Sequence, residues 1–203
     1  MIKNIIFDCG KVIMQYDERY IASFFTDNAE DAALLASVGM HRKYWNAFDD
    51  GALTEEVYLE EVKKELPERL HKSVEALSAK WTSHMPPVPG IEAVIKEIKA
   101  NGKKLYLLSN FNQRLRGELD LAPSLKLFDG LVISGEVGVS KPDARIYEYL
   151  LSTYGLEAGE CIFIDDRQDN LDAGEKLGIK GYLFDGDAEK LLAYLKESGI
   201  LAK

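Results

Sequence analysis

Short apolar runs that stop abruptly at a polar residue constrain the fold of this chain more than any other feature. Such a run is typical of a buried parallel strand, which is covered on both faces and ends where the chain enters a turn. The expected strands are 2–7, 104–108, 131–133, 161–164 and 181–184, and the helical patterns that alternate with them are 91–100, 142–154, 171–177 and 190–196. This alternation predicts an α/β fold, a doubly wound, Rossmann-like parallel sheet with helices on both faces.

The segment between positions 17 and 85 has a different pattern. Its apolar residues recur with a helical period, and no comparable strand-like run interrupts them. The expected helices are 19–25, 29–38, 41–48, 55–66 and 74–81. The proline-rich stretch 86–90 cannot continue a helix and marks the return to the first pattern. We therefore expect two domains: an α/β core of residues 1–15 and 87–203, and an inserted all-helical domain of residues 16–86.

Charge and cysteine usage exclude several classes of function. A formal net charge of −9 repels nucleic acid and anionic membrane surfaces, so neither is an expected partner. Cys9 and Cys161 lie in apolar runs without metal or disulfide spacing, which predicts buried thiols and a reducing cytoplasm. No segment is long and apolar enough to span a bilayer, and the N-terminal run is not a signal peptide. We expect a cytoplasmic monomer or homodimer that binds a small molecule.

Reactive side chains follow the expected strands. In open parallel sheets, ligands bind outside the carboxyl ends of the strands. The residues at these positions are Asp8, Ser109, Lys141 (one loop later), Asp165 and Asp166. Each alone is weak evidence, because helix caps and turns explain many such residues. Together they supply a nucleophile, a hydroxyl donor, a cation and an acidic cluster, which is the set that phosphoryl transfer requires.

Each residue type has a specific chemical use. The carboxylate of Asp8 can attack phosphorus and form an aspartyl-phosphate, which splits one difficult displacement into two easier ones. Asp165 and Asp166 would repel Asp8 unless a divalent cation lay among them, and Mg²⁺ suits oxygen ligands beside a phosphate. Lys141 would neutralise the transferring group. The remaining candidates are Ser109 and Asn110 as phosphate binders, and Asn170 for orienting a metal ligand or water.

Four strings then reveal a family resemblance. IIFDCGKVI, LYLLSN, VSKPDARIY and CIFIDDRQDN resemble, in order, the four motifs of haloacid dehalogenase-like hydrolases. The helical block is similar to the C1 cap of subfamily I, and in detail the chain most resembles the bacterial branch with the α-D-glucose-1-phosphate phosphatases. The resemblance implies a magnesium-dependent phosphatase of a small, sugar-phosphate-like metabolite. It implies Asp8 as nucleophile and metal ligand, Gly10 as a ligand through its carbonyl, Asp166 as a direct ligand, and Asp165 as its neighbour.

Position 10 departs from the family pattern. Most phosphatases of the superfamily have an aspartate there, which protonates the leaving group, whereas this chain has Gly10. Asp17 is the nearest ionisable replacement, although a helix N-cap is the better interpretation of that residue. Two alternatives therefore stay open: a metal-independent 2-haloacid dehalogenase, against which the paired Asp165 and Asp166 argue, and a non-catalytic protein that binds a phosphometabolite.

The helical block is expected to select the substrate, because the core motifs recognise only the phosphoryl group. Candidates for this role are Arg19, Arg42, Lys43, Tyr44, Trp45 and the turn Asp49-Asp50-Gly51. The competing interpretation is that Tyr44 and Trp45 form the apolar core of the helical domain together with Phe48, while the basic residues lie on a solvated face.

Overall fold

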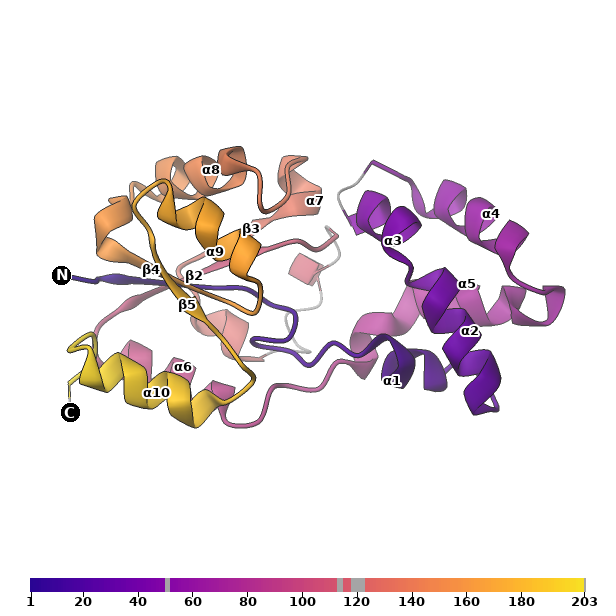
Figure 1. Ribbon diagram of the computed structural model, residues 1–203, viewed down its shortest axis with the longest axis horizontal. Helices are drawn as coiled ribbons and strands as arrows, with labels where there is room; N and C mark the ends of the chain where they lie inside the picture. The colour runs from indigo at the N-terminus through magenta and orange to yellow at the C-terminus, as the bar shows by residue number, and fades with distance from the viewer. Residues whose placement is uncertain (50–51, 113–114, 118–122, 203) are drawn as a thin grey trace. The chain divides into compact units, whose positions relative to one another are not determined.

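The computed structural model describes residues 1–49, 52–112, 115–117 and 123–202 of the 203-residue chain, without the side chains of Arg42 and Asp49. The chain divides into two compact units (Figure 1). Met1–Gln15 and Pro87–Lys203 form the first, which we call the core unit. Tyr16–Pro86 form the second, the helical unit.

The core unit contains a five-stranded parallel sheet. Its strands are β1 (Asn4–Phe7), β2 (Lys104–Ser109), β3 (Gly130–Ile133), β4 (Cys161–Asp165) and β5 (Lys180–Leu183), and their order is β3-β2-β1-β4-β5. Each strand falls on one of the expected apolar runs. The strand order turns back at β1, so β1 and β4 flank the switch point at which open α/β sheets bind ligands.

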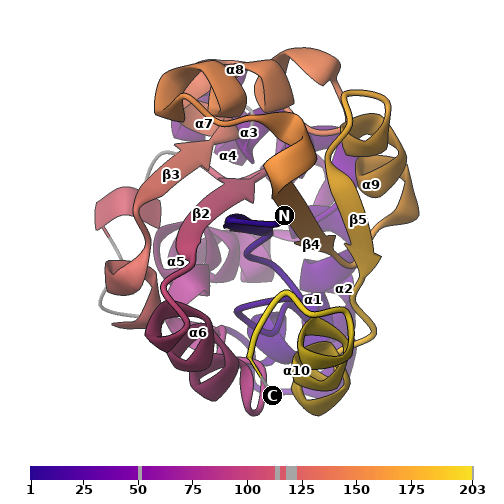
Figure 2. The same ribbon diagram turned by 90° about the vertical axis from the view of Figure 1, so that its left-hand side faces the viewer.

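Helices cover both faces of the sheet (Figure 2). On one face, α6 (Ile91–Ala100) packs beside α10 (Ala188–Glu197), and on the other α8 (Ala144–Tyr154) packs beside α9 (Gln168–Glu175). Helix α6 buries Ile91, Val94, Ile95 and Ile98, the spacing of one helical face. The predicted α/β fold class is therefore confirmed.

Local differences from the expected boundaries have local causes. Helix α8 begins at Ala144 and not at Pro142, because the Asp143 side chain accepts a hydrogen bond from the backbone N–H of Arg145 and acts as the N-cap. A short helix, α7 (Ser134–Val137), was not expected, because four residues are too few to show a helical period. Short 3₁₀ helices include Glu68–Leu70, Trp81–His84, Pro123–Leu127 and Ala158–Glu160.

The described part of the helical unit consists of helices and connecting loops. Its α-helices are α1 (Glu18–Ser23), α2 (Ala29–Gly39), α3 (Arg42–Asp49), α4 (Glu55–Glu65) and α5 (His71–Lys80). An aromatic cluster forms its centre, in which the Trp45 ring lies 5.1 Å from that of Trp81 and 5.8 Å from that of Tyr58, between ring centroids. Such aromatic contacts stabilise a small helical domain beyond the burial of apolar area.

Over the part of the chain that the structure describes, none of the helices has both the length and the apolar character that crossing a membrane requires.

Candidate active site

Strand register places two carboxylates side by side at the switch point. Phe7 of β1 pairs with Ile164 of β4, so the next residues, Asp8 and Asp165, emerge together at the carboxyl edge of the sheet. The backbone N–H of Asp8 donates to the carbonyl of Ile164 over 2.9 Å. Asp165 is fully buried and Asp8 is 9% exposed. Two buried like charges repel each other, so this pair requires a cation.

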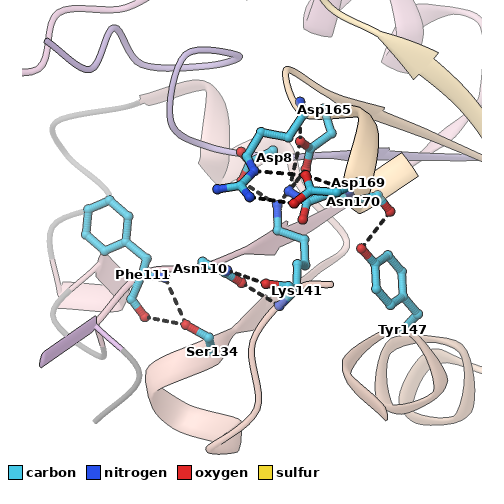
Figure 3. Close-up of polar contacts among 10 residues, drawn as sticks. Asp8, Asn110, Phe111, Ser134, Lys141, Tyr147, Asp165, Asp169 and Asn170 are labelled. Carbon is cyan, nitrogen blue, oxygen red and sulfur yellow. Dashed lines mark hydrogen bonds and ion pairs between the residues drawn. The ribbon is translucent and has the colours of Figure 1, made fainter. Parts of the chain in front are cut away.

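Lys141 supplies a cation between the two carboxylates (Figure 3). Its Nζ lies 2.8 Å from Asp8 Oδ1 and 2.7 Å from Asp165 Oδ2. Burial by itself would lower the pKa of Lys141, but the contacts with Asp8 and Asp165 outweigh it and raise this pKa, so the ammonium stays protonated. Burial raises the pKa of Asp8 to about 6; Lys141 opposes this increase, and the neighbouring charge of Asp165 adds to it.

Both oxygens of Asp165 are engaged by the protein. The Asn170 side-chain Nδ2 donates to each of them over 3.0 Å, and the backbone N–H of Arg167 donates to Oδ1 over 2.8 Å. With Lys141 on Oδ2, Asp165 is held from several sides. Because both of its oxygens already accept hydrogen bonds, Asp165 is better suited to positioning Lys141 than to binding a metal ion directly.

Asn110 and Ser109, at the end of β2, have different surroundings. The side-chain amide of Asn110 accepts from the backbone N–H of Lys141 over 2.8 Å and donates to the Lys141 carbonyl over 2.9 Å, so it holds the lysine loop against β2. Ser109 is 1% exposed, and its Oγ has no hydrogen-bond partner among the described residues. A buried hydroxyl in this condition is suited to an oxygen of a bound ligand. Phosphate contact by either residue stays a prediction.

An acidic cluster completes the site. Carboxylate oxygens of Asp8, Asp165 and Asp166 lie within 4.8 Å of one another. Asp166 is half-buried, and burial together with the neighbouring Asp165 raises its pKa. Gly10 forms an isolated bridge to Met14 in the tight turn after β1. Its carbonyl as a metal ligand stays a prediction.

The residues expected to select substrate lie in the helical unit. Trp45 is 4% exposed inside the aromatic cluster, which supports the packing interpretation for that residue. Tyr44 is buried too, and its hydroxyl donates to Glu65 over 2.5 Å and accepts from Lys43 over 2.7 Å. The exposed basic candidates are Arg19 and Lys43, while the Arg42 side chain and the turn residues Asp50 and Gly51 lie outside the described residues.

Asp17 has a structural role. Its side chain accepts from the backbone N–H of Tyr20 over 2.9 Å and caps α1. This is the interpretation that the sequence favoured over a displaced general acid.

Other polar contacts of the site came from segments without a recognisable signal. The Ser134 hydroxyl accepts from the backbone N–H of Phe111 over 3.0 Å and donates to its carbonyl over 3.2 Å, which holds the loop after β2. The Tyr147 hydroxyl donates to the carbonyl of Asn170 over 2.7 Å. The two residues of each pair are 23 positions apart in the sequence, so no local pattern predicts their contact.

Comparisons with known proteins find relatives by sequence and by fold. The chain is 30% identical to acyl-CoA dehydrogenase family member 10 of Mus musculus over 184 residues, which cover 87% of this chain but 17% of that protein. It is 24% identical to a sesquiterpene phosphatase of Aspergillus oryzae, over 88% of each. A haloacid dehalogenase family enzyme of Bacteroides thetaiotaomicron, solved with magnesium and inorganic phosphate, shares the fold with a TM-score of 0.71 and 20% identity, covering 94% of this chain and 99% of that one.

A family model supplies the assignment. The model of haloacid dehalogenase-like hydrolases matches residues 2–178, which is most of the chain. That range includes the site residues Asp8, Lys141 and Asp165. The chain therefore belongs to the haloacid dehalogenase-like hydrolases.

Proposed function

We propose that this hydrolase is a magnesium-dependent phosphatase that cleaves a small phosphate ester through an aspartyl-phosphate on Asp8. The observation that carries the proposal is the buried contact of Asp8 with Lys141, which Asp165 holds from the other side. We also propose that the core unit is the catalytic domain and that the helical unit is a cap that selects the substrate.

The reaction has two steps. Lys141 occupies Asp8 Oδ1, which leaves Oδ2 to attack phosphorus; the Asp8–phosphorus bond forms as the bond to the leaving oxygen breaks. The ammonium of Lys141 and the unpartnered hydroxyl of Ser109 bind the phosphoryl oxygens as charge develops. A water molecule then attacks phosphorus, which releases inorganic phosphate and restores the Asp8 carboxylate.

The residues of the site fit a magnesium ion. Three carboxylates and one ammonium sum to a formal charge of −2, which one divalent cation neutralises. Asp8 and Asp166 would hold the ion, with the Gly10 carbonyl, since Mg²⁺ prefers oxygen ligands. Bound there, Mg²⁺ would reduce the repulsion between the phosphoryl oxygens and the carboxylates. The Bacteroides thetaiotaomicron enzyme was solved with both magnesium and phosphate, which supports this choice.

The glycine at position 10 narrows the expected substrates. General acid catalysis contributes roughly 100- to 10,000-fold and matters most for poor leaving groups. Without an acid at Gly10, aryl, acyl and anomeric phosphates should react much faster than primary alkyl phosphates. A sugar 1-phosphate is therefore a better candidate than the corresponding 6-phosphate.

A panel of phosphate esters tests the proposal. We expect Mg²⁺-dependent phosphate release from p-nitrophenyl phosphate and α-D-glucose 1-phosphate, slower release from glucose 6-phosphate, and loss of all activity with EDTA. No phosphate release from any ester would support the non-catalytic alternative. Halide release from a 2-haloacid in the presence of EDTA would support the dehalogenase.

A further inference from the structure

Tyr147 lies behind the residues that line the site. This tyrosine of α8 is fully buried, and its hydroxyl donates to the Asn170 carbonyl over 2.7 Å (Figure 3). Its ring packs edge-on against Phe163 of β4, with centroids 5.9 Å apart. Burial raises the pKa of the phenol, so the hydroxyl keeps its proton and donates. Tyr147 is the last residue of the string VSKPDARIY, and the proposed chemistry gives its hydroxyl no role.

A continuous series of contacts joins this hydroxyl to the nucleophile. Asn170 donates to both oxygens of Asp165 over 3.0 Å, and Asp165 Oδ2 lies 2.7 Å from Lys141 Nζ. Lys141 Nζ lies 2.8 Å from Asp8 Oδ1. Every residue of the series is at most 9% exposed. Water therefore has little access and cannot easily replace a lost contact. A displacement of one residue in the series would shift the residues that it contacts.

The Tyr147 hydroxyl contacts the first turn of α9. Asn170 lies in that turn, and Arg167, the N-cap residue, makes no side-chain capping hydrogen bond. A helix start without a side-chain cap is more easily displaced. The Tyr147 hydroxyl, on the neighbouring helix α8, donates to the carbonyl of Asn170 in this turn. This contact would keep the side-chain amide of Asn170 in position against Asp165.

We propose that Tyr147 is a positioning residue for the hydrolytic reaction. Through the carbonyl of Asn170 it fixes the Asn170 side chain on Asp165, and thereby the position of Lys141 against Asp8. This inference rests on the proposed phosphatase function.

Tyr147→Phe tests it, because the change removes one oxygen and keeps the ring. Tyr154→Phe is the matched control. Tyr154 ends the same helix, and its hydroxyl also bonds to backbone, accepting from Leu131 N–H over 3.0 Å and donating to the Leu131 carbonyl over 3.2 Å. Leu131 lies at the opposite end of β3 from the edge that carries the site.

We expect kcat of Tyr147→Phe to fall roughly 3- to 10-fold with little change in KM, below the roughly 10- to 100-fold typical of partners that contact a metal ligand directly. Mg²⁺ affinity, measured by calorimetry with inorganic phosphate, should fall by a similar factor. Tyr154→Phe should change each quantity less than about twofold. Equal effects of the two variants on kcat and on Mg²⁺ affinity would overturn the proposal.

A double-mutant cycle sharpens the test. If Tyr147 acts through Asn170, the double variant of Tyr147→Phe with Asn170→Ala should be no worse than Asn170→Ala alone. Full additivity would contradict the proposed route. If Tyr147→Phe does not fold, Tyr147→Met removes the same hydroxyl with a more adaptable side chain. If the wild type hydrolyses no ester, the phosphatase proposal fails, while the calorimetric comparison still decides the role of Tyr147.

Discussion

The core unit and the helical unit bury different kinds of side chain. The core unit places the charged groups of Asp8, Lys141 and Asp165 in its interior. In the described part of the helical unit, the buried polar residues are the uncharged Ser78 and Thr82. Burying a charged group costs free energy unless the group is paired. We therefore expect buried charges where they take part in the function of the protein.

The interior of the core unit contains reactive polar groups, whereas the described interior of the helical unit is mainly apolar packing. In the core unit, polar side chains meet because strand ends converge at one edge of the sheet. In the helical unit, the centre is occupied by aromatic rings in mutual contact, so the proposed selection of substrate would fall to its exposed residues. The predictions that follow test whether these two kinds of interior respond to mutation as differently as this comparison implies.

Replacing the nucleophile should give the largest effect. Asp8→Asn removes the attacking carboxylate, so we expect phosphatase activity to fall by more than about a thousandfold while the fold is retained. Phosphate release and circular dichroism measure the two outcomes. A tenfold change in rate corresponds to about 1.4 kcal/mol of activation free energy. A folded variant that keeps over a tenth of the wild-type activity would therefore remove Asp8 from the mechanism.

The two adjacent aspartates should behave differently. Asp165→Ala leaves the buried Lys141 without one of its partners, so we expect about 3 to 5 kcal/mol of destabilisation in urea unfolding. Asp166→Ala removes a half-buried carboxylate that is not part of the lysine contact, so we expect weaker Mg²⁺ binding with little loss of stability. Equal losses of stability in the two variants would contradict the assignment of Asp165 as the residue that holds Lys141.

Trp45→Ala tests the aromatic interior of the helical unit. Truncation of a buried aromatic ring should lower the free energy of unfolding by about 3 kcal/mol, whereas truncation of an exposed substrate contact would have little effect. Both tryptophans of the chain, Trp45 and Trp81, lie in this unit, so the fluorescence of Trp81 reports its unfolding selectively. Trp45→Phe, which keeps an aromatic ring, is the control and should cost less.

The smallest expected effect concerns Asp129, a carboxylate of the core unit outside the proposed site. Although burial opposes the shift, hydrogen bonds from Lys99, Lys104 and the backbone N–H of Leu105 lower the pKa of Asp129 to about 2. The folded pKa lies below the unfolded value, so this stability is present above about pH 4 and is lost as pH falls toward 2. Asp129→Asn should therefore cost roughly 1 to 2 kcal/mol at pH 6.

Urea unfolding of the wild type and Asp129→Asn at pH 6 and at pH 3.5 measures this dependence. The difference between the two proteins should shrink at the lower pH. If the difference in unfolding free energy between the two proteins grew on acidification, folding would have to raise the pKa of Asp129, which would contradict the prediction.

Regular elements were predictable because their signals are local. The helix at 91–100 was expected over the same residues that α6 occupies, since its apolar positions repeat with the helical period. Long-range pairing was not predictable in this way. The side chain of Asn110 pairs with the backbone of Lys141, 31 positions away, and no local pattern indicated that contact.

Local patterns were sufficient to predict the parallel α/β sheet, the strand ends that carry Asp8, Ser109 and Asp165, and the family, because apolar periodicity and short motifs are properties of neighbouring residues. Two features became visible in the folded chain alone: Lys141 lies between Asp8 and Asp165, and Trp45 packs inside the helical unit. Burial and ion pairing depend on segments that approach each other through the fold. Their free energy depends on the surroundings that the whole chain creates, which no local pattern encodes.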